Sequence, residues 1–561
     1  MKKRFVKYFT VGLVSCIGLS SCQGLFDLDS NQVLFADDNK LNTSSDSVYS
    51  VIGIVNKMQQ IADRTIILGE IRADLVSLTT SANTELQALA NFTAGTDNKY
   101  NKPEDYYAII NNCNFFLANA DTALKKRNIP VLMKDFAVIK AYRAWTYLQL
   151  AQIYGEVPFI TEPILTEKET NIKYERKSVK DLCNYFIDDL IPYINTEYPG
   201  YGPINGQQSR KFYIPIRLLL GDLCLWAERY KEAAVYYHDY IVDPKNNLIL
   251  GTNRVQWTPS TNTFEGSPNN SYSNLFGDNT SVENIGYIPM EATKFDGLTS
   301  DLRNVFNSTI ENFYFNQATY SNSLKELSKS QAYCKEYVNQ VTSVRDTLFA
   351  PPTNVDNELY VGDLRLSSIY RKTYVNSTSS AYSNERMTNV KIGRNIWTYR
   401  STLVYMRYVE ALNRAGFPSV AFTALKYGLS KENIAKYADS TEVSKAAGST
   451  ILTFSTSNLV TIGLHARGSG DVHANNNYKI PALATKADTI LFVENLICDE
   501  QALETSFEGY RMSDLIRFSL RRNDNTFIAT KIASRNGAAN FSQTLYDKLL
   551  VRKNWYLPLE N

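Results

Sequence analysis

The chain has 561 residues, 44% of them hydrophobic, which is enough apolar material to bury a large core or several packed layers. Its 59 Lys and Arg residues nearly balance its 57 Asp and Glu residues, and this balance argues against a nucleic-acid-binding protein. The chain has only three histidines, so histidine-based acid–base catalysis is disfavoured, and neither a metal site nor a cofactor is predicted.

The first 22 residues have the pattern of a signal for export and lipid attachment. A basic segment, 1–7, precedes an apolar stretch, 8–19, that is too short to cross a bilayer but has the length of a signal-peptide core. Residues 19–22 then read Leu-Ser-Ser-Cys, the lipobox pattern in which the thiol of Cys22 carries the lipid. An ordinary secretory signal with a chance cysteine is the alternative. We therefore predict a signal peptide at 1–21 and a lipidated tether at 22–42.

The remainder of the chain contains no run of 18 apolar residues, so we expect it to be exported and held to a membrane by Cys22 alone. The cysteines that follow the tether are odd in number and widely spaced, which does not suit a disulfide framework. Each is predicted to be a small buried apolar side chain. They are Cys113, Cys183, Cys224, Cys334 and Cys498.

Residues 43–241 are predicted to be helical. The strongest helix runs from 134 to 154 and ends at Gly155. Ala and Leu residues recur along it at spacings of three and four, and they form a stripe of mostly small side chains on which another helix can pack closely. Further helices are predicted at 103–124 and 178–190.

Residues 220–233 resemble the first helix and turn of a tetratricopeptide repeat, in which two antiparallel helices lock together. A weaker echo follows at 408–421. Because the two segments lie far apart, they predict one helical solenoid interrupted by a long insertion. The positions that match the motif in the first segment are Leu220, Gly221, Tyr230 and Ala233.

The insertion, 242–395, is rich in Asn, Ser, Thr, Gly and Tyr, and its helical periodicity is patchy. Long irregular segments on a helical scaffold often carry binding groups, and exposed aromatic rings can stack on sugar rings or side chains. The alternative is that these rings fasten the loops onto the scaffold. The aromatic residues predicted to contact a ligand are Trp257, Tyr272, Tyr287 and Tyr314.

No H-E-x-x-H, P-loop or G-x-S-x-G motif is present. His465, Ser469, Asp471 and His473 lie close together in a glycine-rich segment, as a metal or nucleophile site would. We expect instead a turn whose polar side chains cap its own backbone.

Three carboxylates, those of Glu500, Glu504 and Glu508, share one face of a predicted helix. Glycosidases use a pair of carboxylates, so this face is a candidate for acid–base chemistry. Arg511 stands three residues after Glu508, and ion pairing on a helix surface is the simpler interpretation.

Several segments carry a further pattern, in order along the mature chain. They read Lys-Ala-Tyr-Arg-Ala-Trp-Thr-Tyr-Leu-Gln-Leu at 140–150, Gly-Asp-Leu-Arg at 362–365, Met-Arg-Tyr-Val-Glu-Ala-Leu-Asn-Arg at 406–414, Phe-Glu-Gly-Tyr-Arg at 507–511 and Trp-Tyr-Leu-Pro at 555–558. Together they resemble the SusD/RagB family of outer-membrane lipoproteins of Bacteroidetes. Gln501 and Val409 depart from the family's usual Arg and Ala, which we interpret as scaffold changes. We expect Gly509 to allow a turn that Glu508 and Arg511 hold by charge-assisted bonds.

The resemblance implies a mainly α fold, in which a tetratricopeptide-like α-α superhelix carries a loop-rich insertion and short β-hairpins. The expected regions are an N-terminal helical region at 43–241, the insertion at 242–395, and a C-terminal region at 396–561 that completes the scaffold.

The resemblance also implies a function. Proteins of this family lie as lids on SusC-like TonB-dependent transporters at the outer-membrane surface, where they bind oligosaccharides or, in the RagB branch, oligopeptides. No bond is broken. Trp257 is the only tryptophan of the insertion, so both ligand classes stay open. A surface-anchored glycosidase or peptidase, or a structural adaptor of the transporter that binds no small ligand, is the alternative.

The lipidation hypothesis gives a direct test. Cys22→Ala should abolish membrane anchoring, because the thiol that accepts the lipid is lost and no other anchor is predicted. Fractionation of cells that express the variant measures this, and persistent membrane association would contradict the lipoprotein prediction.

Overall fold

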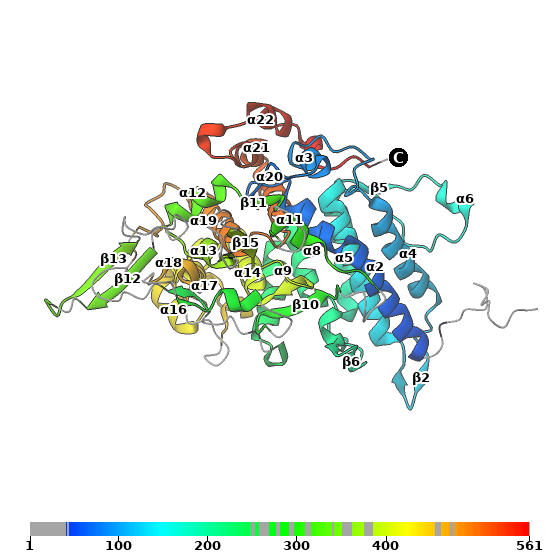
Figure 1. Ribbon diagram of the computed structural model, residues 1–561. Helices are drawn as coiled ribbons and strands as arrows, with labels where there is room; N and C mark the ends of the chain where they lie inside the picture. Colours follow the sequence, from blue (N-terminus) through cyan, green and yellow to red (C-terminus); the bar gives the residue numbers. More distant parts are fainter. Residues whose placement is uncertain are drawn as a thin grey trace, which may run out of the picture.

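The computed structural model describes Leu41 and residues 44–559, apart from 247, 249–252, 257–268, 277–280, 291–296, 309–315, 332, 339–340, 351–361, 375–384, 455–461, 472–474 and 476. This part of the chain is mainly α-helical, and its strands form eight two-stranded antiparallel sheets (Figure 1). The predicted fold class is therefore confirmed. Across the same residues, no helix has both the length and the apolar character that crossing a membrane requires.

Four long helices of the N-terminal region pack against one another. The helix predicted at 134–154 is confirmed and ends at Gly155, whose φ of 78° is a conformation that glycine adopts at little cost. The helix predicted at 103–124 ends earlier, because a hairpin with positive φ at Arg127 and Asn128 follows it. The four helices are α2 (Ser44–Glu70), α4 (Pro103–Asn119), α5 (Met133–Tyr154) and α7 (Val179–Leu190).

The tetratricopeptide-like segment forms the predicted helix pair, α8 (Ile216–Trp226) and α9 (Tyr230–Val242). Gly221 permits the close packing, since a Cβ atom there would lie 2.6 Å from the ring of Tyr237. Helix α9 also packs on α14 (Ser401–Arg414), which packs in turn on α15 (Pro418–Lys426). The two distant helix pairs are therefore neighbours in one helical layer.

Strands tie the insertion to the helical regions. Strand β10 (Asn284–Ile288) pairs with β16 (Ile396–Arg400), and β11 (Ala318–Tyr320) pairs with β1 (Val76–Leu78) near the end of α2. The hairpin of β12 and β13 extends away from the helical body in Figure 1. The other elements of the insertion are α11 (Leu302–Phe306), α12 (Asn322–Ser330), β12 (Tyr333–Val338), β13 (Arg345–Ala350), α13 (Arg365–Ile369), β14 (Tyr370–Tyr374) and β15 (Glu385–Asn389).

The C-terminal region ends in four helices, α19 to α22, drawn in orange to red in Figure 1. Gly509, between α19 and α20, has a φ of 89°, so the predicted turn is confirmed. Its carbonyl group lies so close to Gly69 of α2 that a Cβ atom on Gly69 has no room. The bounds are α19 (Lys486–Thr505), α20 (Arg511–Arg522), α21 (Asn525–Ala533) and α22 (Gln543–Leu549), with α16 (Lys431–Tyr437), α17 (Ser440–Lys445) and α18 (Ala466–Ser469) before them.

The remaining elements are short. They are α3 (Thr84–Ala90), β2 (Lys125–Lys126), β3 (Ile129–Pro130), β4 (Val157–Pro158), α6 (Glu167–Thr170), β5 (Arg176–Lys177), β6 (Pro203–Ile204), β7 (Gln207–Gln208), β8 (Val255–Gln256) and β9 (Asn269–Asn270), together with several single turns of 3₁₀-helix. All five cysteines that follow the tether are buried and unpaired, as predicted.

The carboxylates of α19 and of the turn after it point into the protein. Glu500 and Glu504 are buried, and Glu508 is nearly so. Arg365 pairs with Glu500 and donates from Nη1 to Glu504 Oε2 over 3.0 Å. Arg400 donates from Nη1 to Glu504 Oε1 over 3.0 Å and from Nε to Glu508 Oε2 over 2.7 Å. One helix face thus collects arginines from two distant segments.

The prediction of surface ion pairs is therefore wrong, because the face of α19 that carries Glu500 and Glu504 packs against the protein. Glu508 does not share that face as predicted, because the helix ends at Thr505. Arg511 donates from Nε to Asp74 Oδ1 over 2.6 Å, and Glu508 bonds to Lys391 over 2.6 Å. The turn at Gly509 is thus held by partners from other segments and not by a bond between its own two charged residues.

Electrostatics of the network favour ionised carboxylates. Burial alone would raise the pKa of Glu504, but the guanidinium groups of Arg467, Arg400 and Arg365 outweigh burial and hold that pKa well below its usual range. The stabilisation from a depressed pKa is present above the unfolded value of about 4.5 and is lost as the pH falls toward the folded value.

We expect Glu504→Gln to lower the free energy of unfolding at pH 7 by about 3–5 kcal/mol, because three buried guanidinium groups lose a shared carboxylate. Urea unfolding followed by circular dichroism measures this change. Glu432→Gln, an exposed position in α16, is the matched control and should change it by less than about 0.5 kcal/mol. A loss below about 1 kcal/mol for Glu504→Gln would contradict the structural role of the network.

Candidate functional site

The glycine-rich segment around α18 is buried and bonded to other parts of the chain. His465 Nδ1 lies 2.9 Å from Glu500 Oε2, and the His465 ring stacks on Tyr478 with centroids 3.8 Å apart. Ser469 Oγ donates to Asp363 Oδ2 over 2.8 Å. These side chains do not cap their own turn, so that prediction is wrong, because each has a buried partner elsewhere.

No nucleophile and base meet in this segment among the residues described, and no group of three or more His, Cys, Asp or Glu side chains there is placed to hold a metal ion. Asp471 accepts a hydrogen bond from the backbone of Glu336 over 3.1 Å. His473 lies outside the described residues.

Two of the four predicted ligand contacts lie in the core. Tyr272 is 0% exposed, and its hydroxyl donates to the carbonyl of Glu504 over 3.3 Å. Tyr287 is 2% exposed and donates to Gln207 Oε1 over 2.8 Å. Both rings pack on side chains of the protein, so neither offers a free face for stacking.

These two tyrosines match the alternative interpretation, in which aromatic rings fasten the insertion to the scaffold. The other two predicted contacts, Trp257 and Tyr314, lie outside the described residues.

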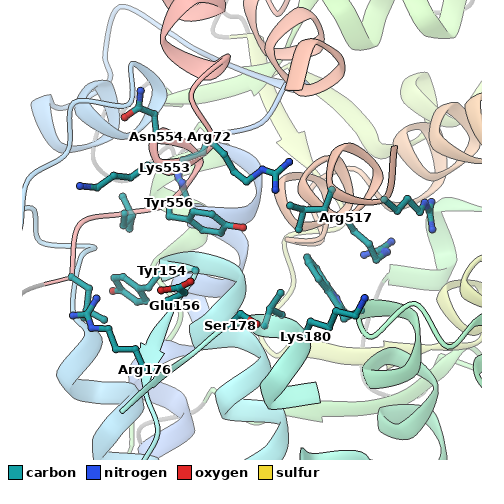
Figure 2. Close-up of a pocket in the computed structure, with 18 of the residues that line it drawn as sticks. Arg72, Tyr154, Glu156, Arg176, Ser178, Lys180, Arg517, Lys553, Asn554 and Tyr556 are labelled. Atoms are coloured by element: carbon teal, nitrogen blue, oxygen red, sulfur yellow. The ribbon is translucent and has the colours of Figure 1, made fainter. Parts of the chain in front are cut away.

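A cavity of about 950 Å³ opens between the end of α5, the start of α7, the turn from α8 to α9, helix α20 and the C-terminal segment 552–559 (Figure 2). This volume lies in the range of sites for small molecules. We call it the C-terminal cavity. Figure 2 shows Arg72, Tyr556 and Tyr154 on one side of it and Arg517 on the opposite side.

Local packing explains how the C-terminal segment becomes a wall of this cavity. The amide of Leu557 donates to the carbonyl of Ile153 over 3.0 Å, and buried Trp555 donates from Nε1 to the carbonyl of Leu549 over 2.7 Å. A Cβ atom on Gly155 would lie 3.1 Å from the ring of Tyr556. Glycine at the end of α5 therefore lets this ring lie against the helix end.

The walls combine aromatic rings with basic side chains. Tyr154 and Trp226 are buried, and Tyr230 and Tyr556 are partly exposed. Two acidic residues line the cavity, Glu156 and Glu228. The basic residues of the lining are more numerous, and they are Arg72, Arg176, Lys180, Arg517, Arg521, Arg552 and Lys553.

Some of these charges are neutralised within the protein. Arg517 and Arg521 both donate to Glu410, over 2.7 and 2.9 Å, and Lys180 lies 3.4 Å from Glu228. Arg72 differs, because no carboxylate among the described residues pairs with it. Burial lowers the pKa of Arg72 to about 10.

Sequence reasoning did not find the C-terminal cavity, because its lining comes from segments hundreds of residues apart. The sequence signal at this cavity is the Trp-Tyr-Leu-Pro run at 555–558, which belongs to the family resemblance.

Comparisons with known proteins place the fold. No family model matches the chain, and no curated protein matches it either. Solved structures do match. A SusD superfamily protein from Bacteroides vulgatus ATCC 8482 is 11% identical with a TM-score of 0.56, over 90% of this chain and 92% of that chain.

Two further structures agree. A SusD superfamily protein from Bacteroides thetaiotaomicron VPI-5482 is 14% identical with a TM-score of 0.54, over 90% and 93% of the two chains. A SusD-like carbohydrate binding protein from Bacteroides vulgatus ATCC 8482 is 14% identical with a TM-score of 0.52, over 85% and 84%. The likeness shows a SusD-like fold, as the family resemblance predicted.

Proposed function

We propose that the protein is a surface-exposed lipoprotein of the bacterial outer membrane that binds oligosaccharides or oligopeptides and delivers them to a SusC-like TonB-dependent transporter. The observation that carries this proposal is the SusD-like fold, which extends over most of the chain and is shared with a protein named as carbohydrate binding. The lipobox at Cys22 supports the anchor, and the predicted tether at 22–42 would join the lipid to the folded part of the chain.

Binding without catalysis fits the chemistry of the three carboxylates that the sequence suggested for acid–base chemistry, those of Glu500, Glu504 and Glu508. The carboxylates that the sequence placed on one helix face are committed to buried arginines, and Arg365 and His465 hold the pKa of Glu500 at about 2 against the effect of burial. A general acid needs a proton near neutral pH, which these groups do not carry. The affinity would come from aromatic and polar contacts.

Two regions are candidates for the ligand contact. The insertion carries Trp257, which remains a proposed contact, and the C-terminal cavity carries the rings of Tyr154, Trp226 and Tyr556. The proposed function does not require one ligand to contact both regions.

Titration calorimetry tests the binding function and separates the ligand classes. The mature chain carrying Cys22→Ala is titrated with neutral and acidic oligosaccharides and with short peptides. We expect saturable binding of one class and an affinity about thirtyfold lower in Trp257→Ala, because a stacked aromatic ring contributes about 2 kcal/mol. Tyr49→Ala, at a residue that is 77% exposed, is the matched control and should change nothing.

Unchanged affinity in Trp257→Ala removes that residue from the site. No binding by any class, together with copurification with a large β-barrel transporter, would favour the adaptor alternative.

A further inference from the structure

Arg72 is a buried cation without a counter-charge. It is 1% exposed, its Nη2 donates to the carbonyl of Trp555, and its guanidinium lies 5.5 Å from the ring centroid of Phe92. Its Nε has no hydrogen-bond partner in the part of the chain that the structure describes. Burying a guanidinium without an opposite charge is costly, because neither backbone carbonyls nor an aromatic ring replaces a carboxylate.

Other buried arginines of the described chain have carboxylate partners. Arg365, Arg400 and Arg511 each pair with at least one carboxylate. Arg535 is a second exception, but it does not line the cavity, and its Nη2 donates to the backbone carbonyl of Arg72 over 3.1 Å. Arg72 is therefore a buried arginine of the cavity lining that has no carboxylate partner among the described residues.

The lining of the cavity holds a second buried polar group. Tyr154 is buried and lines the same cavity as Arg72, and its hydroxyl has no hydrogen-bond partner among the described residues. Burial raises the pKa of Tyr154, so the hydroxyl stays protonated and can donate. In Figure 2, Tyr556 lies between Arg72 and Tyr154. The cavity therefore offers a ligand a guanidinium donor from Arg72, a hydroxyl donor from Tyr154 and an aromatic surface from Tyr556.

The surroundings are also suited to an anion. Arg176, Lys180, Arg552 and Lys553 line the cavity and are exposed, and the only carboxylates in the lining are Glu156 and Glu228. An excess of positive charge around a concave site attracts anionic ligands from solution.

We propose that the C-terminal cavity binds a carboxylate of the ligand, with Arg72 as the ion-pair partner and Tyr154 as a hydrogen-bond donor. The inference rests on the proposed binding function and names its chemical class, an acidic ligand. The carboxylate can belong to a uronic acid unit of a saccharide or to the C-terminus of a short peptide. An Arg–carboxylate pair in a desolvated site gives both affinity and orientation.

The test is titration calorimetry on the mature chain with Cys22→Ala, using two matched pairs of probes. Trigalacturonate is compared with galactotriose, and N-acetyl-trialanine is compared with N-acetyl-trialanine amide. We expect one acidic probe to bind at least about tenfold more tightly than its neutral partner, since a charge-assisted bond contributes about 1.5–3 kcal/mol. The pair that shows the preference identifies the source of the carboxylate.

Substitutions of cavity residues test which side chains cause the preference for the acidic probe. Arg72→Met should remove the preference for the acidic probe. Tyr154→Phe should weaken binding of that probe several-fold without unfolding the protein, because it deletes a hydroxyl that has no hydrogen-bond partner among the described residues. Lys553→Met should weaken it slightly, and the exposed Lys431→Met in α16 is the matched control and should have no effect. Circular dichroism checks the fold of each variant.

Equal affinity for the acidic and neutral members of both pairs would overturn the proposal while the binding function stands. An acidic preference that survives both Arg72→Met and Tyr154→Phe would overturn it as well. Absence of binding by both acidic probes, while a neutral saccharide or peptide of the wider panel binds, would overturn this proposal and leave the binding function standing.

Discussion

The buried ion pairs of α19 are the constraint on which the rest of the structure depends. Glu504 binds Arg365 and Arg400, which lie 139 and 104 residues before it, and Arg467 lies within 3.5 Å of the same carboxylate. A charge in the core is tolerated only when it is paired and hydrogen-bonded, so these segments must converge on α19 for the core to form. The insertion thereby returns to the helical scaffold at a fixed place, however irregular its own chain is.

This arrangement also separates scaffold from site. The acidic side chains that suggested catalysis are neutralised by arginines inside the protein, and His465 is held between Glu500 and Tyr478. The C-terminal cavity differs, because Arg72 is buried there and no carboxylate of the described residues pairs with it. A cation that the fold leaves unpaired is better placed to meet a ligand than one that the fold has already neutralised.

The sequence predicted the local structure well where the signal lies in neighbouring residues. The helix that ends at Gly155 and the helix pair around Gly221 follow from periodicity, a helix-ending glycine and a small residue at a helix contact. The spacing of Glu500 and Glu504 predicted one shared face correctly, but spacing does not say what that face touches. For the same reason the sequence did not predict the burial of Tyr272 or the C-terminal cavity, since the residues that surround each of them come from segments far away in the chain.

Mass spectrometry of a ligand recovered after prolonged incubation with the protein tests the central claim most directly, which is that the chain binds and does not cleave. The account predicts that a saccharide or peptide shown to bind is recovered with its mass unchanged at every time and pH. Cleavage products that form with the wild-type chain, and fail to form with a Glu500→Gln variant that still folds, would contradict it.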